Sequence, residues 1–165
     1  MNRYLHRGLQ AAAATALACA LAVPAFADQG TVVNVTLWDK GASAPMSTDE
    51  GMGMMHASMA GTMMGIKADK TSAKAGEVTF KVTNTSKETV HEMLVVPAPA
   101  DGKLPYSDSE GKFDEDKAGS LGEVEELDPG KSGELTLNLK PGKYVLSCNV
   151  ANHFANGMWT TFTVK

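Results

Sequence analysis

The stretch KPGKYVLSCNVANHFANGM, residues 140–158, decides the fold of this chain. A turn signal at Pro141 opens it, and Tyr144, Leu146 and Cys148 then alternate with the residues between them. This period of two predicts a half-buried strand. A further strand is predicted to begin at Met158. A short loop joins the two predicted strands, and we therefore expect the ends of the loop to lie close together.

The rest of the chain repeats this pattern of strands and turns. Three more runs place apolar residues on one face with a period of two, and turn signals rich in Gly and Pro separate the runs. Short strands with frequent turns favour an antiparallel β-sandwich or barrel. The apolar residues of the runs are Val33, Val35 and Leu37, then Val78, Phe80 and Val82, and then Leu135, Leu137 and Leu139.

Residues 1–27 have the features of a secretory signal peptide. Arg3 and Arg7 provide a positive start, an apolar run follows, and residues 25–27 form a small-x-small cleavage site. The apolar run is shorter than the roughly 20 residues that cross a bilayer, which argues against a membrane anchor. We therefore expect cleavage after Ala27, a periplasmic location, and a mature domain of residues 28–165 without membrane insertion.

Acidic residues outnumber basic ones and gather in one part of the chain. The formal net charge of −4 becomes −6 without residues 1–27, which hold two Arg and no acids. Ten of the 19 acids lie between residues 101 and 128. This charge disfavours nucleic acid and anionic membranes as partners. We interpret residues 98–122 as an acidic, solvated insertion that holds a short helix or a structured loop.

Cys148 is the one cysteine that follows the predicted signal peptide. An unpaired thiol in an oxidising compartment is buried, reactive or bound to metal. His153 and Met158 follow Cys148 in the pattern C-x4-H-x4-M. Because a thiolate, an imidazole and a thioether are soft donors, and the short loop lets them converge, we predict a copper site. Zinc also takes Cys and His, but it has little use for a thioether.

A trigonal copper site with a weak axial Met needs a second imidazole. The candidates are His91, which opens an apolar run, and His56, which lies among Gly and Met residues. We choose His91, because a strand holds a ligand in place better than a flexible segment does.

Residues 141–148, followed by His153 and Met158, resemble the C-terminal signature of the cupredoxins, the small blue copper proteins. The C-x4-H-x4-M spacing is most similar to that of rusticyanin, auracyanin and sulfocyanin. The resemblance covers most of residues 31–165. It implies an all-β fold, a cupredoxin-like Greek-key β-sandwich of about 7–8 strands. It also implies one type 1 copper ion, and the ligands would be His91, Cys148, His153 and Met158.

The same resemblance implies electron transfer by cycling of copper between Cu(I) and Cu(II), with a redox partner protein. We expect a monomer that is not an enzyme. Copper oxidases of this lineage need further His-rich sites, and only three His follow residue 27. Many members of the family carry Asn or Ser directly after the first ligand His, where this chain has Glu92.

The segment of residues 41–65 is rich in methionine. Seven of the ten Met lie between residues 46 and 64, together with His56. Met among Gly and Ser is not a strand pattern, and thioethers prefer Cu(I). This Met-rich loop is therefore a candidate for a second Cu(I) site. It supports an alternative function, a copper binding or delivery protein for copper tolerance, and its composition resembles that of periplasmic copper-tolerance cupredoxins.

Overall fold

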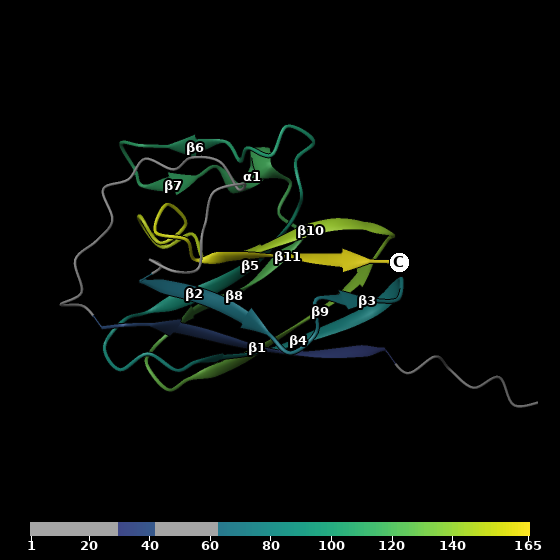
Figure 1. Ribbon diagram of the computed structural model, residues 1–165, viewed down its shortest axis with the longest axis horizontal. Coiled ribbons are helices and arrows are strands. Elements are labelled where there is room, and N and C mark those ends of the chain that lie inside the picture. Colours follow the sequence, from purple (N-terminus) through teal and green to yellow (C-terminus); the bar gives the residue numbers. More distant parts are fainter. Residues whose placement is uncertain (1–29, 42–62) are drawn as a thin grey trace, which may run out of the picture.

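The computed structural model describes residues 30–41 and 63–165, which form two facing β-sheets (Figure 1). The predicted signal peptide and most of the predicted Met-rich loop lie outside the described residues. In these two ranges, none of the helices has the length and hydropathy needed to cross a membrane.

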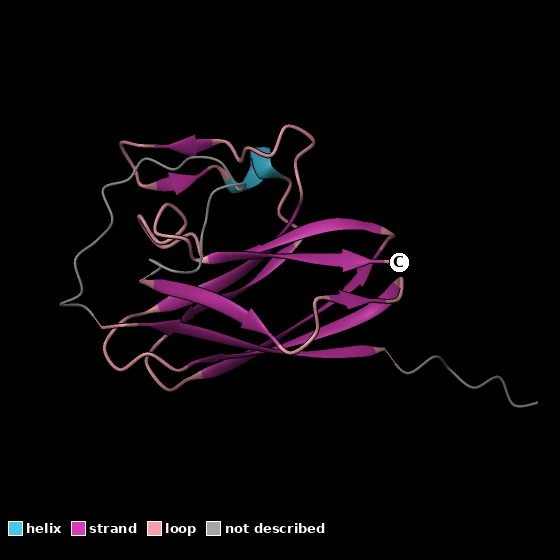
Figure 2. Cartoon of the chain, in the orientation of Figure 1, coloured by secondary structure: helices cyan, strands magenta, loops and turns pink. Residues whose placement is uncertain are grey.

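The first sheet has the strand order β2-β1-β4-β9 and the second has the order β3-β11-β10-β5-β8. A third sheet pairs β6 with β7, and the helix α1 follows it (Figure 2). The elements are β1 (Thr31–Asp39), β2 (Met64–Ala68), β3 (Ser72–Ala73), β4 (Gly76–Asn84), β5 (His91–Pro97), β6 (Tyr106–Ser107), β7 (Lys112–Phe113), α1 (Glu115–Ala118), β8 (Gly122–Leu127), β9 (Ser132–Leu139), β10 (Gly142–Ser147) and β11 (Trp159–Val164).

This arrangement confirms the expected Greek-key β-sandwich. Strands that are neighbours in a sheet are mostly not consecutive in the chain, because the chain crosses repeatedly between the two sheets. Most pairs are antiparallel, but β1 pairs with β4 and β3 with β11 in parallel. Three of the described strands, β3, β6 and β7, have only two residues, and the others have five or more.

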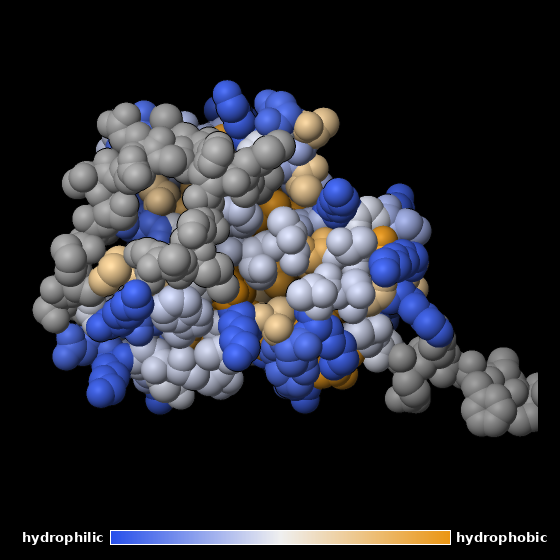
Figure 3. All heavy atoms as spheres, viewed as in Figure 1, coloured by the Kyte–Doolittle hydropathy of each residue, from blue (hydrophilic) through white to orange (hydrophobic). Residues whose placement is uncertain are grey.

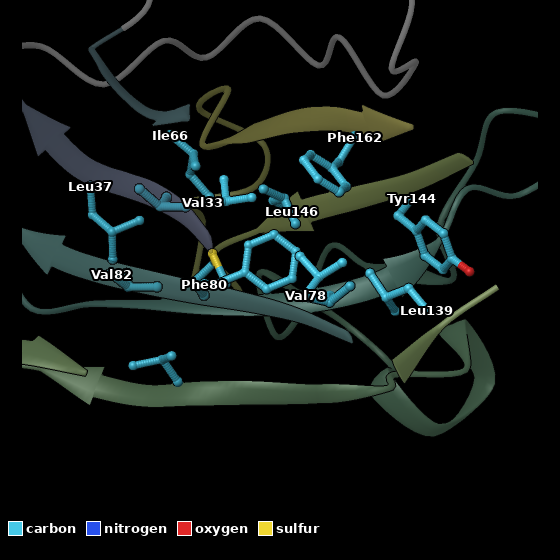
Figure 4. Packing of buried hydrophobic residues seen from close by; sticks show 14 of the residues in the cluster. Val33, Leu37, Ile66, Val78, Phe80, Val82, Leu139, Tyr144, Leu146 and Phe162 are labelled. Carbon is cyan, nitrogen blue, oxygen red and sulfur yellow. The ribbon is translucent and has the colours of Figure 1, made fainter. Parts of the chain in front are cut away.

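The main core lies between the two sheets and contains the residues that the period of two placed on one face. Phe80 from β4 and Phe162 from β11 meet there edge to face, with their ring centroids 5.4 Å apart (Figure 4). Burial of such apolar side chains is the main favourable term in folding. Leu135 and Leu137 are only half-buried, because β9 is an edge strand.

A second, smaller core lies on the outer face of the second sheet. Strand β5 is buried on both faces, so that its alternation is invisible in its sequence. Met93 and Val95 face the main core, whereas Leu94 and Val96 belong to the second core. Leu104 and Phe113 from the segment 98–122 complete that second core. The segment predicted as a solvated acidic insertion therefore has an apolar side that packs on the sheet.

Large exposed apolar side chains are few in the described part of the chain. Val32 and Leu121 are the ones that stand out; Val32 lies on β1, and Leu121 lies directly before β8. The face in Figure 3 is mainly hydrophilic where its atoms are not grey. Scattered apolar residues of this kind are normal on protein surfaces.

Candidate metal centre

His91 is the first residue of β5 and points into the main core side of the sandwich, where it is fully buried. The segment before it is fixed by Asn84, a buried amide at the end of β4. Its Nδ2 donates to the carbonyl oxygens of Thr89 and Leu127, at 2.8 Å in both cases. His91 pairs with Leu127 of β8, and the register shifts between His91 and Met93. Sheet pairing and this amide together set the position of His91.

Cys148 directly follows β10, and Met158 directly precedes β11. The backbone N–H of Cys148 donates to the carbonyl oxygen of Met158 at 3.0 Å, and this bond closes the loop between the two strands. A further bond, from Met158 N–H to the His153 carbonyl oxygen at 3.0 Å, folds His153 back toward the same end. We call residues 149–157 the ligand loop; Figure 1 shows it in yellow next to β7.

Three predicted ligands meet at one point. One donor atom from each of His91, Cys148 and His153 lies within 4.8 Å of the other two. His153 Nδ1 is 3.2 Å from His91 Nδ1 and 3.3 Å from Cys148 Sγ. His153 itself is 7% exposed, whereas the other two are fully buried. Two ring nitrogens and a sulfur that converge in this way offer their lone pairs to a single cation.

Burial keeps these groups in their neutral forms when no metal is present. It lowers the pKa of His153 to about 4, with the His91 ring as a second cause. Burial also lowers the pKa of His91, against the opposing effect of Asp39. Burial raises the pKa of the Cys148 thiol to about 12. The imidazoles are therefore ready to donate lone pairs, and a metal that binds the sulfur must displace its proton.

Met158, the fourth predicted ligand, is fully buried in the same core cluster as Cys148. The bond from Cys148 N–H places its backbone directly beside that of the cysteine. His56, the other candidate for the second imidazole, lies outside the described residues.

Glu92 stands where many cupredoxins have Asn or Ser, and it connects the two halves of the centre. Its Oε1 accepts a hydrogen bond from the backbone N–H of Asn149, the residue after Cys148, at 2.9 Å. Burial raises the pKa of Glu92 to about 7. The glutamate thus ties the strand of His91 to the strand end of Cys148.

The segment 98–122 holds the ligand loop from its other side. The side chain of Asn149 accepts from Phe113 N–H at 2.9 Å and donates to the Phe113 carbonyl and to Glu115 Oε1, at 2.9 and 2.8 Å. Further along the loop, Asn152 N–H donates to the Gly111 carbonyl at 2.7 Å. The ring of Phe154 packs against those of Tyr106, Phe113 and Trp159, with centroid distances of 5.8, 5.6 and 6.4 Å.

Sequence reasoning missed Asp39, whose carboxylate lies 3.1 Å from His91 Nε2. It also missed Asn149 and Gly111. Asp39 is the last residue of β1, a strand whose alternation is clear in the sequence, so the end of this strand could be predicted. The sequence holds no sign that this end lies beside His91, because the contact is made between the two sheets.

Comparisons with known proteins support the fold. No family profile and no curated protein sequence matches the chain. Several solved structures do. Auracyanin from the photosynthetic bacterium Roseiflexus castenholzii is 22% identical, with a TM-score of 0.52 over 83% of this chain and 98% of that chain. Auracyanin B is 20% identical, with a TM-score of 0.52 over 82% of this chain and 88% of that chain.

Rusticyanin from Thiobacillus ferrooxidans is also similar. It is 18% identical, with a TM-score of 0.51 over 83% of this chain and 79% of that chain. At these identities the likeness concerns the path of the backbone. Together with the strand order, it shows that this chain has the cupredoxin fold, as auracyanin and rusticyanin do.

Proposed function

We propose that this protein is a type 1 blue copper protein of the periplasm that carries one electron to or from a redox partner protein, and that it is not an enzyme. The observation that carries the proposal is the convergence of His91, Cys148 and His153 at the end of a cupredoxin fold, with Met158 beside Cys148. Rusticyanin, which has the same fold, is a copper protein.

The donor set fits copper. A thiolate, two imidazoles and a thioether are the ligands of blue copper sites, in which the thioether is weak and axial. Bound copper would supply one-electron transfer by cycling between Cu(I) and Cu(II). The chain supplies the rest, because His91 is fixed on a paired strand and the ligand loop is bonded to its neighbours. A rigid donor set lets both oxidation states be held with little rearrangement.

The visible spectrum of the copper-loaded protein tests this function. We expect an intense blue colour from charge transfer between the Cys148 thiolate and Cu(II). The substitution Cys148→Ser should abolish the colour, because a hydroxyl is a poor ligand for copper. A Cu(II) protein with only weak visible bands would exclude a type 1 site.

Copper delivery for copper tolerance is the second candidate function, and the Met-rich loop favours it. Both ends of that loop lie at the metal end of the sandwich. Asp39 of β1 pairs with Met64 of β2, and Lys40 N–H donates to the Met63 carbonyl oxygen at 2.9 Å. The loop thus leaves and rejoins the sandwich next to the residue that contacts His91.

Deletion of residues 46–62 tests the second function while it leaves β1 and β2 intact. Five residues would still link Lys40 to Met63, which is enough for a hairpin connection. If the loop binds Cu(I), the wild-type protein should bind more than one Cu(I) per chain and the deletion should bind one. The blue spectrum should not change. One Cu(I) per chain in both proteins, with unchanged copper tolerance in cells, would exclude the delivery function and leave electron transfer as the proposed function.

A further inference from the structure

Asp39 is a charged residue outside the four predicted ligands, and it lies against one of them. Its Oδ2 is 3.1 Å from His91 Nε2. The side chain of Asp39 is 5% exposed and that of His91 is 0% exposed. Water screens a charge at such a place much less than it screens a charge on the surface. The carboxylate therefore acts on His91 both through a hydrogen bond and through its field.

The two oxygens of the Asp39 carboxylate have different partners. Oδ1 accepts a hydrogen bond from the backbone N–H of Gly41 at 2.8 Å, while Oδ2 faces His91. The backbone of Asp39 is itself fixed, because the residue ends β1 and pairs with Met64 of β2. The bond from Gly41 thus helps to orient the carboxylate so that Oδ2 faces the imidazole.

This contact determines which nitrogen of His91 is available as a ligand. An ionised carboxylate can only accept a hydrogen bond, so Nε2 must carry the proton. A neutral imidazole has one N–H, and Nδ1 therefore holds a lone pair. Nδ1 is also the atom that faces His153 Nδ1 at 3.2 Å, in the middle of the centre. The proton and the lone pair are thus on the sides where a metal centre needs them.

The same geometry places a negative charge next to a ligand of the proposed metal. A nearby negative charge stabilises Cu(II), the more positive state, relative to Cu(I). Resting on the blue copper function proposed above, we propose that Asp39 is the positioning residue of the centre: it fixes the Nε2–H tautomer of His91 and lowers the reduction potential of the copper that His91 binds.

The first test needs no copper, so it is independent of the proposed function. Nitrogen–proton correlation spectra of the imidazoles in the metal-free wild-type protein identify the tautomer of His91. We expect the proton on Nε2 and an unprotonated Nδ1. A proton on Nδ1 would overturn the proposal, even if the copper-loaded protein is blue.

The second test measures the reduction potential of Asp39→Asn, with Asp69→Asn as a matched control. Both changes remove one negative charge. Asp69 is exposed and hydrogen-bonds to Asn34, five residues before Asp39 on β1. The amide at position 39 keeps an acceptor oxygen for His91 Nε2, so the protein should stay blue. The wild-type colour also shows separately whether the proposed function holds.

We expect Asp39→Asn to raise the ratio of Cu(I) to Cu(II) at a fixed potential by about tenfold, which is about 59 mV for one electron. Asp69→Asn should shift it much less. Equal shifts in the two variants would overturn the electrostatic role of Asp39. In Asp39→Ala, which offers no acceptor, we expect the His91 tautomer to become mixed in the metal-free protein. A pure Nε2–H tautomer in that variant would overturn the positioning role.

Discussion

The two sheets of the sandwich differ in what covers their outer faces. The first sheet, β2-β1-β4-β9, turns a polar face to solvent, where Thr79 and Thr136 share a hydrogen bond at 2.9 Å and Lys81 pairs with Glu134 at 3.3 Å. The second sheet is covered over β5 and β10 by the segment 98–122. His91 lies on a strand of the second sheet, and the other three predicted ligands lie in residues 148–158, which connect two strands of that sheet, β10 and β11.

This difference shows how the chain makes one of its sheets rigid. A sheet with one solvent-exposed face packs against a core on its other face only. Strands β5 and β10, in contrast, are packed on both faces. The same covering segment bonds to the ligand loop through Asn149 and Gly111. The same segment, residues 98–122, therefore covers the second sheet and supports the ligand loop. The first sheet contributes to the centre through Asp39, at the end of β1.

The largest expected effect is the loss of the centre itself. His91→Ala removes a buried predicted ligand from the second sheet, and we expect the copper-loaded variant to lack the blue spectrum. The matched change His56→Ala affects a residue of the Met-rich loop and should leave the spectrum unaltered. Visible absorption of the two copper-loaded variants decides between the histidines. The opposite result would move the second imidazole out of the sheet and reassign the site to His56.

Phe113→Ala tests whether the second core supports the metal centre in a way that the main core does not. Phe113 is almost fully buried in the second core, and the loss of such a ring costs about 3–5 kcal/mol of unfolding free energy. Phe80→Ala makes the same change in the main core and should cost a similar amount. Denaturant unfolding measures both costs in the metal-free proteins.

The spectra of these two variants should nevertheless differ. Phe113 packs against Phe154 of the ligand loop, so its loss should broaden or shift the blue band in the folded protein. Phe80 has no such contact with the loop among the aromatic pairs of the described residues. If both variants kept an unchanged blue band under folding conditions, the covering segment would not support the centre.

Gly111→Ala probes the same support with a smaller change. Gly111 has a φ of 65°, and an added Cβ would lie 2.9 Å from the backbone nitrogen of Asn152. Gly102 has a similar φ of 72° and open space around it. Gly102→Ala should therefore lower the free energy of unfolding only by the cost of a left-handed backbone conformation, about 1–2 kcal/mol. Gly111→Ala should cost clearly more in thermal unfolding and should disturb the blue band, because the ligand loop must move. Equal costs would mean that the loop yields without strain.

The alternation of residues in single strands predicted much of this fold. The runs at Val33, Val78 and Tyr144 are where the sequence placed them, because each strand buries the same face that its pattern shows. The position of Cys148 and Met158 at the ends of one loop also followed from that pattern. The sequence alone therefore predicted that Cys148, His153 and Met158 lie close together.

The surroundings of the centre could not be predicted in the same way. Strand β5 is buried on both faces, so its sequence does not show which residues face the covering segment. The acidic residues of that segment indicated a solvated surface, and they concealed the contribution of Leu104 and Phe113. The contacts of Asp39 and Asn149 join elements that are far apart in the chain. Such contacts depend on tertiary packing, which no local period reports.

The smallest expected effect lies on the first sheet, away from the centre. Asp69 accepts hydrogen bonds from the Asn34 backbone N–H at 2.9 Å and from Asn34 Nδ2 at 2.7 Å. These bonds, with the side chain of Asn34 first, lower the pKa of Asp69 from its ordinary value of 3.8. The folded state therefore binds the proton less tightly than the unfolded state does. It follows that the carboxylate stabilises the fold above the unfolded pKa, and that this stabilisation is lost as the pH falls through the folded pKa.

Thermal unfolding of the metal-free wild type and of Asp69→Asn as a function of pH measures this contribution. The wild type should be slightly more stable at neutral pH, and the difference should shrink as the pH falls through the lowered pKa of the Asp69 carboxyl group. The effect is small because Asp69 is exposed and solvent screens its charge. A difference that stayed constant with pH would show that the amide disturbs the turn in another way. At each pH at which both proteins stay folded, Asp69→Asn and the wild type should have the same blue spectrum, because Asp69 bonds to the first sheet and the predicted ligands belong to the second sheet and its loop.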